Sequence, residues 1–342
     1  MDDNLHKTDF GEFLDALSDV NHPFPPALLR GASDLSKVQL KKLLPIWATL
    51  PSARRINFLE DLEELMEKDT LVSFDQLALA VLSDPEPKVR ILAIRLLWEC
   101  EDTHIIATIV DMMLEDPEEA VRAAAANFLG KFVYLGELES IADTHKISVV
   151  RNLLEVLASE ELPQVKQRAL ESLGYSSHPK IPSLITSALS SGETLWMSAA
   201  MAAISHSADE AWEPHVLAHL NHGDHEVQFE AVRAAGELEL TSALQPLAEM
   251  LENDTVDPEI RMAAIWSLSQ IGGDFARDLL HNLLNTTEDE DEIELIEAAL
   301  ENMETGIDPQ GFKMINFDPD EDENEEDYDF EEDDVDEVED FG

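Results

Sequence analysis

The sequence has a single cysteine, Cys100, among its 342 residues. One thiol excludes an internal disulfide framework and fits a reducing compartment. The start MDDNLHKTDFGEF has neither the basic segment nor the apolar core of a secretory signal, so we expect a cytoplasmic protein. No window reaches the roughly 20 uncharged apolar residues of a membrane-spanning helix, so we expect no membrane contact.

Positive charge is also scarce. The chain has 22 Lys and Arg against 74 Asp and Glu, a formal net charge of -52. Residues 307–342 hold 18 acids and one base, Lys313, for -17, which leaves 56 acids and 21 bases, or -35, elsewhere. Both parts repel phosphate groups, so nucleic acid is not expected as a partner. A protein or peptide ligand is favoured, with a basic one as an option.

A repeated phrase stands out against this composition. "VDPEIRMAAIWSLSQIGG" at 256–273 has earlier copies at 83–100 and 115–132. One aliphatic residue of the phrase, taken as an anchor, recurs at intervals of 32, 44, 30, 32, 33 and 33 residues: Val89, Val121, Val165, Leu195, Val227, Ile260 and Ile293. A period in the thirties is typical of stacked helix pairs. The long interval indicates an insertion between helices at 134–146.

The residues around each anchor predict the two helices of a pair. Small or apolar residues stand four and eight positions after it, as Ala93 and Leu97 do after Val89, which is one face of an α-helix. A shorter amphipathic run before each anchor predicts the first helix. Asp-Pro steps such as Asp116-Pro117 predict the turn and N-cap. Glycines near the ends of the second helices predict C-caps: Gly130, Gly174, Gly236 and Gly272.

This pattern resembles HEAT repeats of the short type associated with phycobilisome-lyase-like proteins, over residues 36–304. The resemblance implies an all-α superhelical solenoid of about eight helix pairs. It also implies a ladder of acidic and basic residues between neighbouring pairs, here Asp84 and Arg90, Asp116 and Arg122, Lys166, and Asp257 and Arg261. We expect an N-terminal helix and Pro-rich cap at 1–33, the solenoid at 34–306, and an acidic, disordered tail at 307–342.

A solenoid offers an extended concave groove lined by its second helices. If the anchor faces inward, the third, sixth and tenth residues after it look into the groove. Six of these positions are candidate binding residues, as exposed bases and aromatics: Arg95, Lys131, Arg168, Tyr175, Arg233 and Trp266. An ordinary solvated face is the alternative. The tail is interpreted as a solubilising segment, a docking site for a basic partner, or a competitor for the groove.

Catalytic and metal chemistry is poorly supported. Four histidines lie within eleven residues, His215, His219, His222 and His225, and two of them share a helix face. We interpret them as packing or surface positions, with a metal site as the alternative. No cofactor is predicted. The sequence therefore favours a non-enzymatic scaffold or adaptor, and the alternative is a HEAT-like enzyme, such as a bilin lyase, or a metal-binding protein. A deoxyhypusine hydroxylase would need several His-Glu pairs, and only His225-Glu226 is present.

Overall fold

The computed structural model describes residues 10–253 and 255–305, which belong to one compact unit that ends at Gly306. These residues form helices and turns, with no strand among them. The predicted all-α class is therefore confirmed. The acidic tail lies outside the described residues, and the predicted division at residues 33 and 306 stays a prediction.

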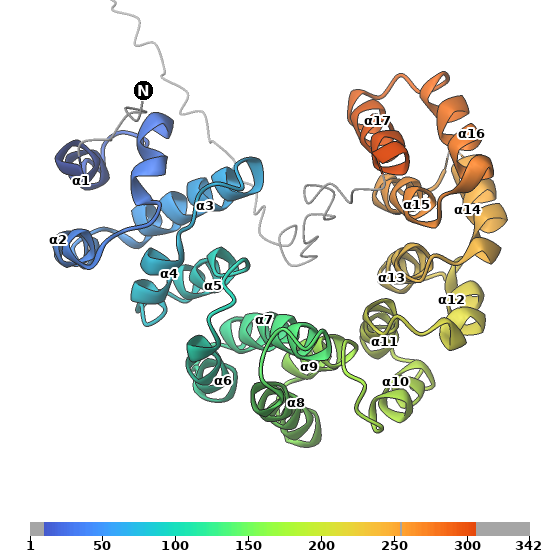
Figure 1. Ribbon diagram of the computed structural model, residues 1–342, viewed down its shortest axis with the longest axis horizontal. Coiled ribbons are helices and arrows are strands. Elements are labelled where there is room, and N and C mark those ends of the chain that lie inside the picture. The colour runs from blue at the N-terminus through green and yellow to red at the C-terminus, as the bar shows by residue number, and fades with distance from the viewer. Residues whose placement is uncertain (1–9, 254, 306–342) are drawn as a thin grey trace, which may run out of the picture. The chain divides into compact units, whose positions relative to one another are not determined.

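Eight helix pairs follow one another along the chain, as the repeat predicts (Figure 1). The first helices are α2 (Lys37–Trp47), α4 (Asp75–Val81), α6 (Ile106–Glu115), α8 (Asp143–Ala158), α10 (Ile181–Leu189), α12 (Glu213–His219), α14 (Leu244–Leu251) and α16 (Gly273–Leu284). The second helices are α3 (Ser52–Lys68), α5 (Pro87–Leu96), α7 (Glu119–Glu137), α9 (Pro163–Leu173), α11 (Thr194–His206), α13 (His225–Glu237), α15 (Pro258–Ile271) and α17 (Glu290–Thr305). Short 3-10 turns precede three of the first helices: η2 (Thr103–Ile105), η3 (Glu210–Trp212) and η4 (Thr241–Ala243).

The second helices form the inner side of this row and the first helices its outer side (Figure 1). Consecutive second helices pack against each other from α3 to α17, and those from α5 onward also pack against their own first helices, whereas consecutive first helices touch much less. Close packing on one side and loose packing on the other curve a row of helices toward the tightly packed side. Four of the anchors, Val89, Val121, Val165 and Val227, are fully buried in this layer, whereas Leu195 is only partly buried.

Glycines account for the tightest contacts of the inner layer. A Cβ on Gly174 would lie 2.6 Å from Cα of Ala203 in α11, and one on Gly236 would lie 2.8 Å from Cα of Ser267 in α15. A Cβ on Gly130 would lie 2.8 Å from Oγ and 3.2 Å from Cα of Ser172 in α9. All three were expected to be C-caps, but Gly130 and Gly236 lie inside their helices and allow helix-to-helix approach. Gly174 is the C-cap residue of α9 and keeps a right-handed conformation. Gly272 is the C-cap residue of α15, and its φ of 71° is one that glycine adopts readily.

An ion-pair ladder joins the turns of neighbouring pairs. The guanidinium of Arg90 donates to both carboxylate oxygens of Asp116 at 2.7 and 2.8 Å, and a third N–H reaches the carbonyl of Asp84 at 2.8 Å. Arg122 with Glu161 and Arg261 with Glu292 form similar rungs that end on glutamate, and Arg55 reaches both carboxylate oxygens of Asp84 through one nitrogen. The ladder implied by the resemblance is thus present at four joints, and Lys166 and Asp257, which the resemblance also named, are not among these rungs.

The turns differ from the prediction in one respect. Helices α5 and α7 begin two residues after the predicted Pro85 and Pro117. The carboxylate of Asp116 accepts the amide of Glu118 at 3.0 Å while it binds Arg90, so it organises the turn before the helix. At α15 the predicted arrangement is present, since Asp257 accepts the amide of Glu259 at 2.9 Å and Pro258 is the first helical residue.

The expected insertion at 134–146 is mostly helical. Helix α7 continues without interruption to Glu137, and α8 begins at Asp143, so the extra residues lengthen both helices around a short turn. The buried side chains of Phe132, Val133 and Leu135 explain why α7 continues, because they extend its apolar face.

The N-terminal segment covers the first pair. Helix α1 (Phe10–Ser18) and the 3-10 helix η1 (Pro26–Ala32) pack on α2 and α3. Phe13 and Phe24 form edge-to-face contacts with Phe58 of α3, and Arg54 donates to the carbonyl of Ala16 at 2.8 Å, near the end of α1. The segment thereby closes the apolar end of the row, which a terminal repeat otherwise exposes.

The substitution Gly174→Ala tests the close approach of α9 and α11. The added methyl group meets backbone of Ala203 that cannot rotate away, so we expect a loss of about 1–3 kcal/mol in the free energy of unfolding. Urea titration followed by circular dichroism measures it. The matched control is Gly223→Ala, where nothing lies within 4 Å of the new atom. Equal stability of the two variants would contradict the packing argument.

The substitution Arg90→Ala tests the ladder. Both side chains of this ion pair are 8% exposed, so loss of the cation leaves a buried carboxylate and should lower the unfolding free energy by about 3–5 kcal/mol. Arg151→Ala is the control, because Arg151 and Glu155 are 64% and 65% exposed. Such surface pairs contribute below about 1 kcal/mol. A small effect of Arg90→Ala in urea unfolding would show that the rung is not structural.

Candidate binding surface

The predicted basic binding residues lie half-buried along the second helices, and each is held by a neighbour. The pairs are Arg95 with Glu63, Lys131 with the carbonyl of Trp98, Arg168 with Glu171, and Arg233 with Glu230. The surface around them therefore carries both signs of charge. Within the described residues, each of these four cations therefore lies beside an acidic group or a carbonyl.

Trp266 is not the exposed binding residue that the sequence suggested. Only 6% of the residue is exposed, and its ring lies against Gly236 of the preceding pair, where a Cβ would come within 2.8 Å of Cζ3. Met201 and Ala263, which were expected to share its surface, are fully buried. The expected phase is wrong at α11 and α15, because these positions are buried; at Trp266 the cover includes α13 of the preceding pair.

Tyr175 belongs to a row of rings at the ends of three second helices. Its ring stacks on His206 at 4.1 Å between centroids, nearly parallel, and Tyr134 of α7 lies 5.5 Å away on its other side. Tyr134 is 47% exposed, and Leu138 one turn further along is 55% exposed. We call these four residues the aromatic edge. Three of them, Tyr134, Leu138 and His206, were not predicted as binding residues, because they stand beyond the tenth residue after their anchors. The signal that could have found them is an aromatic ring near the end of three consecutive second helices.

Burial sets the protonation states along the aromatic edge. It lowers the pKa of His206 to about 4, helped by the positive charge of Arg233, and the neutral ring donates from Nδ1 to the carbonyl of Glu171 at 3.0 Å. Burial also raises the pKa of Tyr175, and the charge of Glu237 acts in the same direction. Both rings are therefore neutral near pH 7 and present an apolar stack with fixed orientation.

Charged groups of α9 and α13 flank this edge. Burial raises the pKa of Glu230, against the nearby charge of Arg233, and Glu171 and Arg168 of α9 also act on it. Helix α11 lies between α9 and α13, and its side chains on this side are small, since Ser198 and Ser205 are buried there. The small residues let charges from two non-consecutive helices influence each other across α11.

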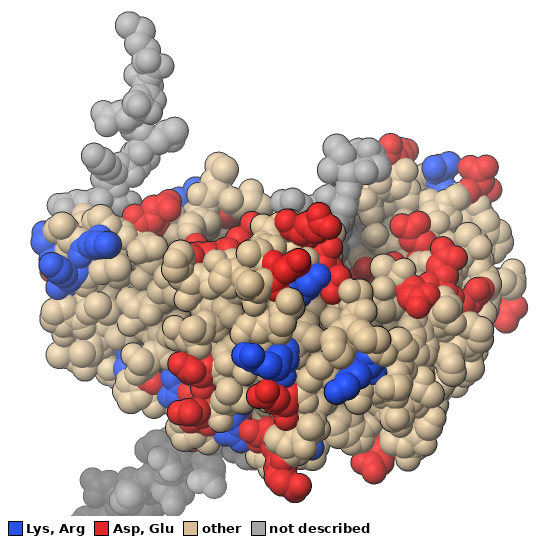
Figure 2. All heavy atoms as spheres, turned by 60° about the horizontal axis from the view of Figure 1, so that its bottom comes forward, with Lys and Arg blue, Asp and Glu red and all other residues tan. Residues whose placement is uncertain are grey.

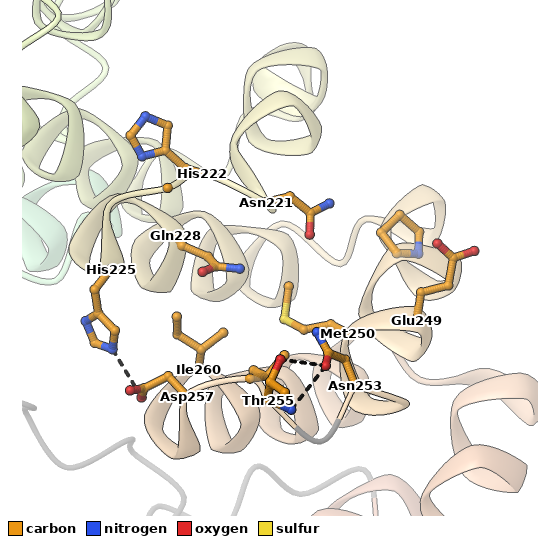
Figure 3. A pocket seen from close by; sticks show the side chains of 13 residues that line it. Asn221, His222, His225, Gln228, Glu249, Met250, Asn253, Thr255, Asp257 and Ile260 are labelled. Atoms are coloured by element: carbon orange, nitrogen blue, oxygen red, sulfur yellow. Dashed lines mark hydrogen bonds and ion pairs between the residues drawn. The ribbon is translucent and has the colours of Figure 1, made fainter.

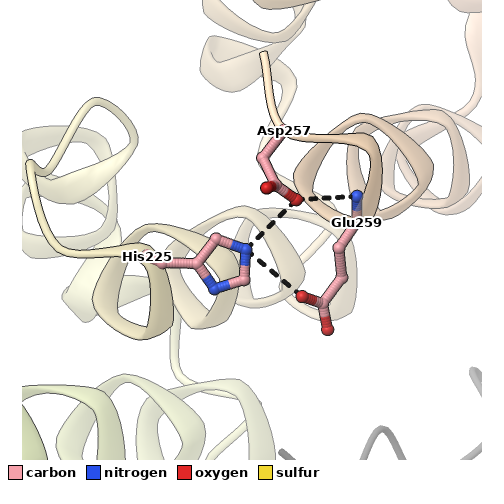
Figure 4. A group of neighbouring side chains, drawn as sticks. All are labelled: His225, Asp257 and Glu259. Atoms are coloured by element: carbon pink, nitrogen blue, oxygen red, sulfur yellow. Dashed lines mark hydrogen bonds and ion pairs between the residues drawn. The ribbon is translucent and has the colours of Figure 1, made fainter. Parts of the chain in front are cut away.

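The four candidate histidines do not converge on one metal. His215 and His219 lie on α12, where His219 contacts the carbonyl of His215 at 2.7 Å, and the rings of His219 and His222 lie 5.8 Å apart. His225 points away from them toward the next pair. Its Nε2 lies 3.2 Å from Oδ1 of Asp257 and 3.2 Å from Oε2 of Glu259 (Figure 4). Among the described residues, this is the one cluster of three potential metal donors.

A pocket of about 460 Å³ opens beside His225, between the turn before α13 and the turn before α15 (Figure 3). Its lining is largely polar and includes Asn221, Gln228, Glu249 and Thr255, with Met250 and Ile260 as apolar walls. Burial opposes a charge on His225, but Asp257 and Glu259 outweigh it and raise its pKa. The pocket therefore has a cationic or metal-binding group on one rim.

Two potential nucleophiles, Cys100 and Ser177, lie in surroundings that do not activate them. Burial raises the pKa of the Cys100 thiol, which keeps it protonated, and the hydroxyl of Ser177 donates to the carboxylate of Glu137.

On the face seen in Figure 2, basic and acidic side chains are interspersed between wide areas of other residues. No helix among the described residues combines the length and apolarity needed to cross a membrane.

Comparison with known proteins agrees with this architecture. The model of HEAT repeats matches residues 75–143 and 213–301, which cover α4 to α7 and α12 to most of α17. HEAT repeats are therefore present in this chain, over these two segments. No curated protein matches it significantly.

Solved structures show a general likeness of fold. The CpcE–CpcF complex of phycocyanin lyase from a Nostoc species is 18% identical, covers 67% of this chain and 94% of its own, and has a TM-score of 0.44. The YibA protein of Escherichia coli is 20% identical over 82% of this chain and 96% of its own, with a TM-score of 0.40. Human deoxyhypusine hydroxylase is 15% identical over 86% and 97%, with a TM-score of 0.36. Likeness at this level carries no function.

The pKa of His206 predicts an acid-sensitive joint between α9 and α11. The folded-state pKa of about 4 lies below the ordinary 6.5, so the unfolded chain binds more protons as the pH falls below 6.5. Stability is therefore lost from pH 6.5 downward. Between pH 7 and pH 5 the native protein should lose about 1–2 kcal/mol more than a His206→Gln variant in urea unfolding. His215→Gln, at an exposed site, should keep the native pH dependence, and an identical response of both variants would contradict the assignment.

Proposed function

We propose that the protein is a non-enzymatic scaffold that binds a partner protein or peptide on the inner side of its helix row. The binding surface is centred on the aromatic edge of Tyr134, Leu138, Tyr175 and His206. The cytoplasm is its proposed location, given the lone buried thiol of Cys100.

The observation that carries this proposal is the exposure of Tyr134 and Leu138 beside the stacked rings of Tyr175 and His206. Tyrosine supplies a large contact area with few rotatable bonds, and it is enriched among the residues that dominate binding energy. Tyr134 stands on a long helix whose other faces are buried, and Tyr175 supports its ring. A partner that covers these two residues therefore gains apolar contact with little ordering of side chains.

Charge narrows the class of partner. Arg168, Glu171, Glu230 and Arg233 next to the aromatic edge supply both donors and acceptors, while the chain as a whole carries -52. A negative field of this size accelerates encounter with basic proteins and slows encounter with polyanions. We therefore propose a partner with positive net charge and an apolar contact segment, and the acidic tail as a modulator of its approach.

The substitution Tyr134→Ala tests the proposed surface. Proteins captured by the native chain should be released by this variant, with an affinity loss of about 2 kcal/mol, or roughly 30-fold, as expected for a central aromatic contact. Val38→Ala is the matched control, because Val38 is exposed on α2, away from the inner side. Quantitative binding of the captured partner at low and high salt provides the measurement.

Two outcomes would contradict the proposal. If Tyr134→Ala and Val38→Ala bind the partner as the native chain does, the aromatic edge is not the binding surface. If the association becomes tighter with added salt, the charge argument is wrong, since screening weakens attraction between opposite charges.

A further inference from the structure

The joint between the sixth and seventh helix pairs is built differently from the other joints of the ladder. At four joints a guanidinium spans to the next turn and donates two or more N–H groups. At this joint the residue that follows the anchor Val227 is Gln228, whose amide donates to the carbonyl of Leu220 within its own pair at 3.0 Å. The side chain that reaches the next turn is the imidazole of His225.

From this geometry we infer that His225, Asp257 and Glu259 form a binding site for one divalent transition-metal ion of the zinc class. The three donors come from the first residue of α13, the N-cap of α15 and the first turn of α15 (Figure 4). The ion would bridge two consecutive helix pairs.

The distances between the donor atoms fit such an ion. Nε2 of His225 lies 3.2 Å from Oδ1 of Asp257 and 3.2 Å from Oε2 of Glu259, and all three donors lie within 4.8 Å of one another. Zinc binds imidazole nitrogen and carboxylate oxygen at about 2.0–2.2 Å, which separates neighbouring tetrahedral ligands by about 3.3 Å. An ion placed between these atoms therefore needs only small movements of the side chains.

A simple ion pair explains the arrangement less well. An imidazolium Nε2–H has one direction and forms one strong hydrogen bond, yet two carboxylate oxygens lie at the same distance from this nitrogen. The nitrogen is buried and makes no well-aligned hydrogen bond within the described residues. A metal ion attracts all three atoms at once, because coordination has no requirement for a single shared axis.

Neighbouring groups supply the outer shell that metal ligands usually have. Oε1 of Glu226 lies 3.6 Å from Nδ1 of His225, on the ring edge opposite the proposed ion. A carboxylate in this position orients the imidazole and increases its basicity. The amide of Glu259 fixes the carboxylate of Asp257 at 2.9 Å. The pocket of about 460 Å³ beside His225 and Asp257 leaves room for water or an outside ligand on the remaining positions (Figure 3).

The test uses the full-length chain and Zn²⁺ alone as the probe, with Mg²⁺ in excess to occupy sites that consist only of oxygen donors. Competition with a coloured chelator should reveal one tight equivalent in the native protein. Co²⁺ should give the intense visible spectrum of a four-coordinate site, and Zn²⁺ should raise the melting temperature of the native chain.

Three substitutions and one control define the site. His225→Ala, Asp257→Asn and Glu259→Gln should each weaken Zn²⁺ binding by more than the about 10- to 100-fold that loss of an outer-shell partner causes. Asparagine is as good an N-cap as aspartate, so Asp257→Asn removes the charge and keeps the helix start. His222→Ala is the matched control, since His222 lines the same pocket outside the donor set.

Binding that is equal in the native chain and the His225→Ala variant would overturn the inference, as would an equal loss in His222→Ala. An absence of any tight equivalent, together with unchanged melting temperature in Zn²⁺, would show that the three groups form an ion pair only. Unfolding curves of the metal-free variants identify any loss that comes from misfolding, and Asp257→Asn then decides the question.

Discussion

The structure depends on how closely one second helix can approach the next. At Gly130, Gly174 and Gly236 the neighbouring chain comes so near that a single methyl group would overlap it. At Gly174 the contact is with backbone alone, and at Gly236 it includes Cα of Ser267. Backbone has no alternative rotamer to relieve a clash. Close approach buries most sides of each second helix, and it leaves only a narrow strip on the inner side for interaction with other molecules.

The ladder of ion pairs joins neighbouring helix pairs separately from the packing of the second helices. It lies at the turns, where Arg90 and its equivalents tie one pair to the next through partly buried carboxylates. Because each pair contacts little beyond its neighbours, stability is a sum of local terms, and a change at one joint stays near that joint. A protein of this kind can therefore vary one rung without loss of the fold, and the joint at His225 is such a variation.

The sequence predicted the fold well because period and residue size are local properties. Spacing of the anchors is enough to place seven of the eight helix pairs, and small residues four positions later are enough to place the packed face. The exposure of a side chain is a different matter, since it depends on the size of its neighbour in an adjacent pair. Trp266 is covered because Gly236 leaves space for its ring, while Arg95 at the same position reaches the surface.

The candidate metal site shows more clearly that contacts between pairs are not read from neighbours in the sequence. Four histidines close together in the sequence suggested a local cluster, yet His225 meets Asp257 and Glu259, which stand 32 and 34 residues later. That separation is one period of the repeat, as it is for the 31 residues between Arg261 and Glu292. In a stacked chain the spatial neighbours of a turn are the turns one period away. Chemistry in such proteins is therefore found by comparing each residue with those one repeat before and after it, rather than with its neighbours along the chain.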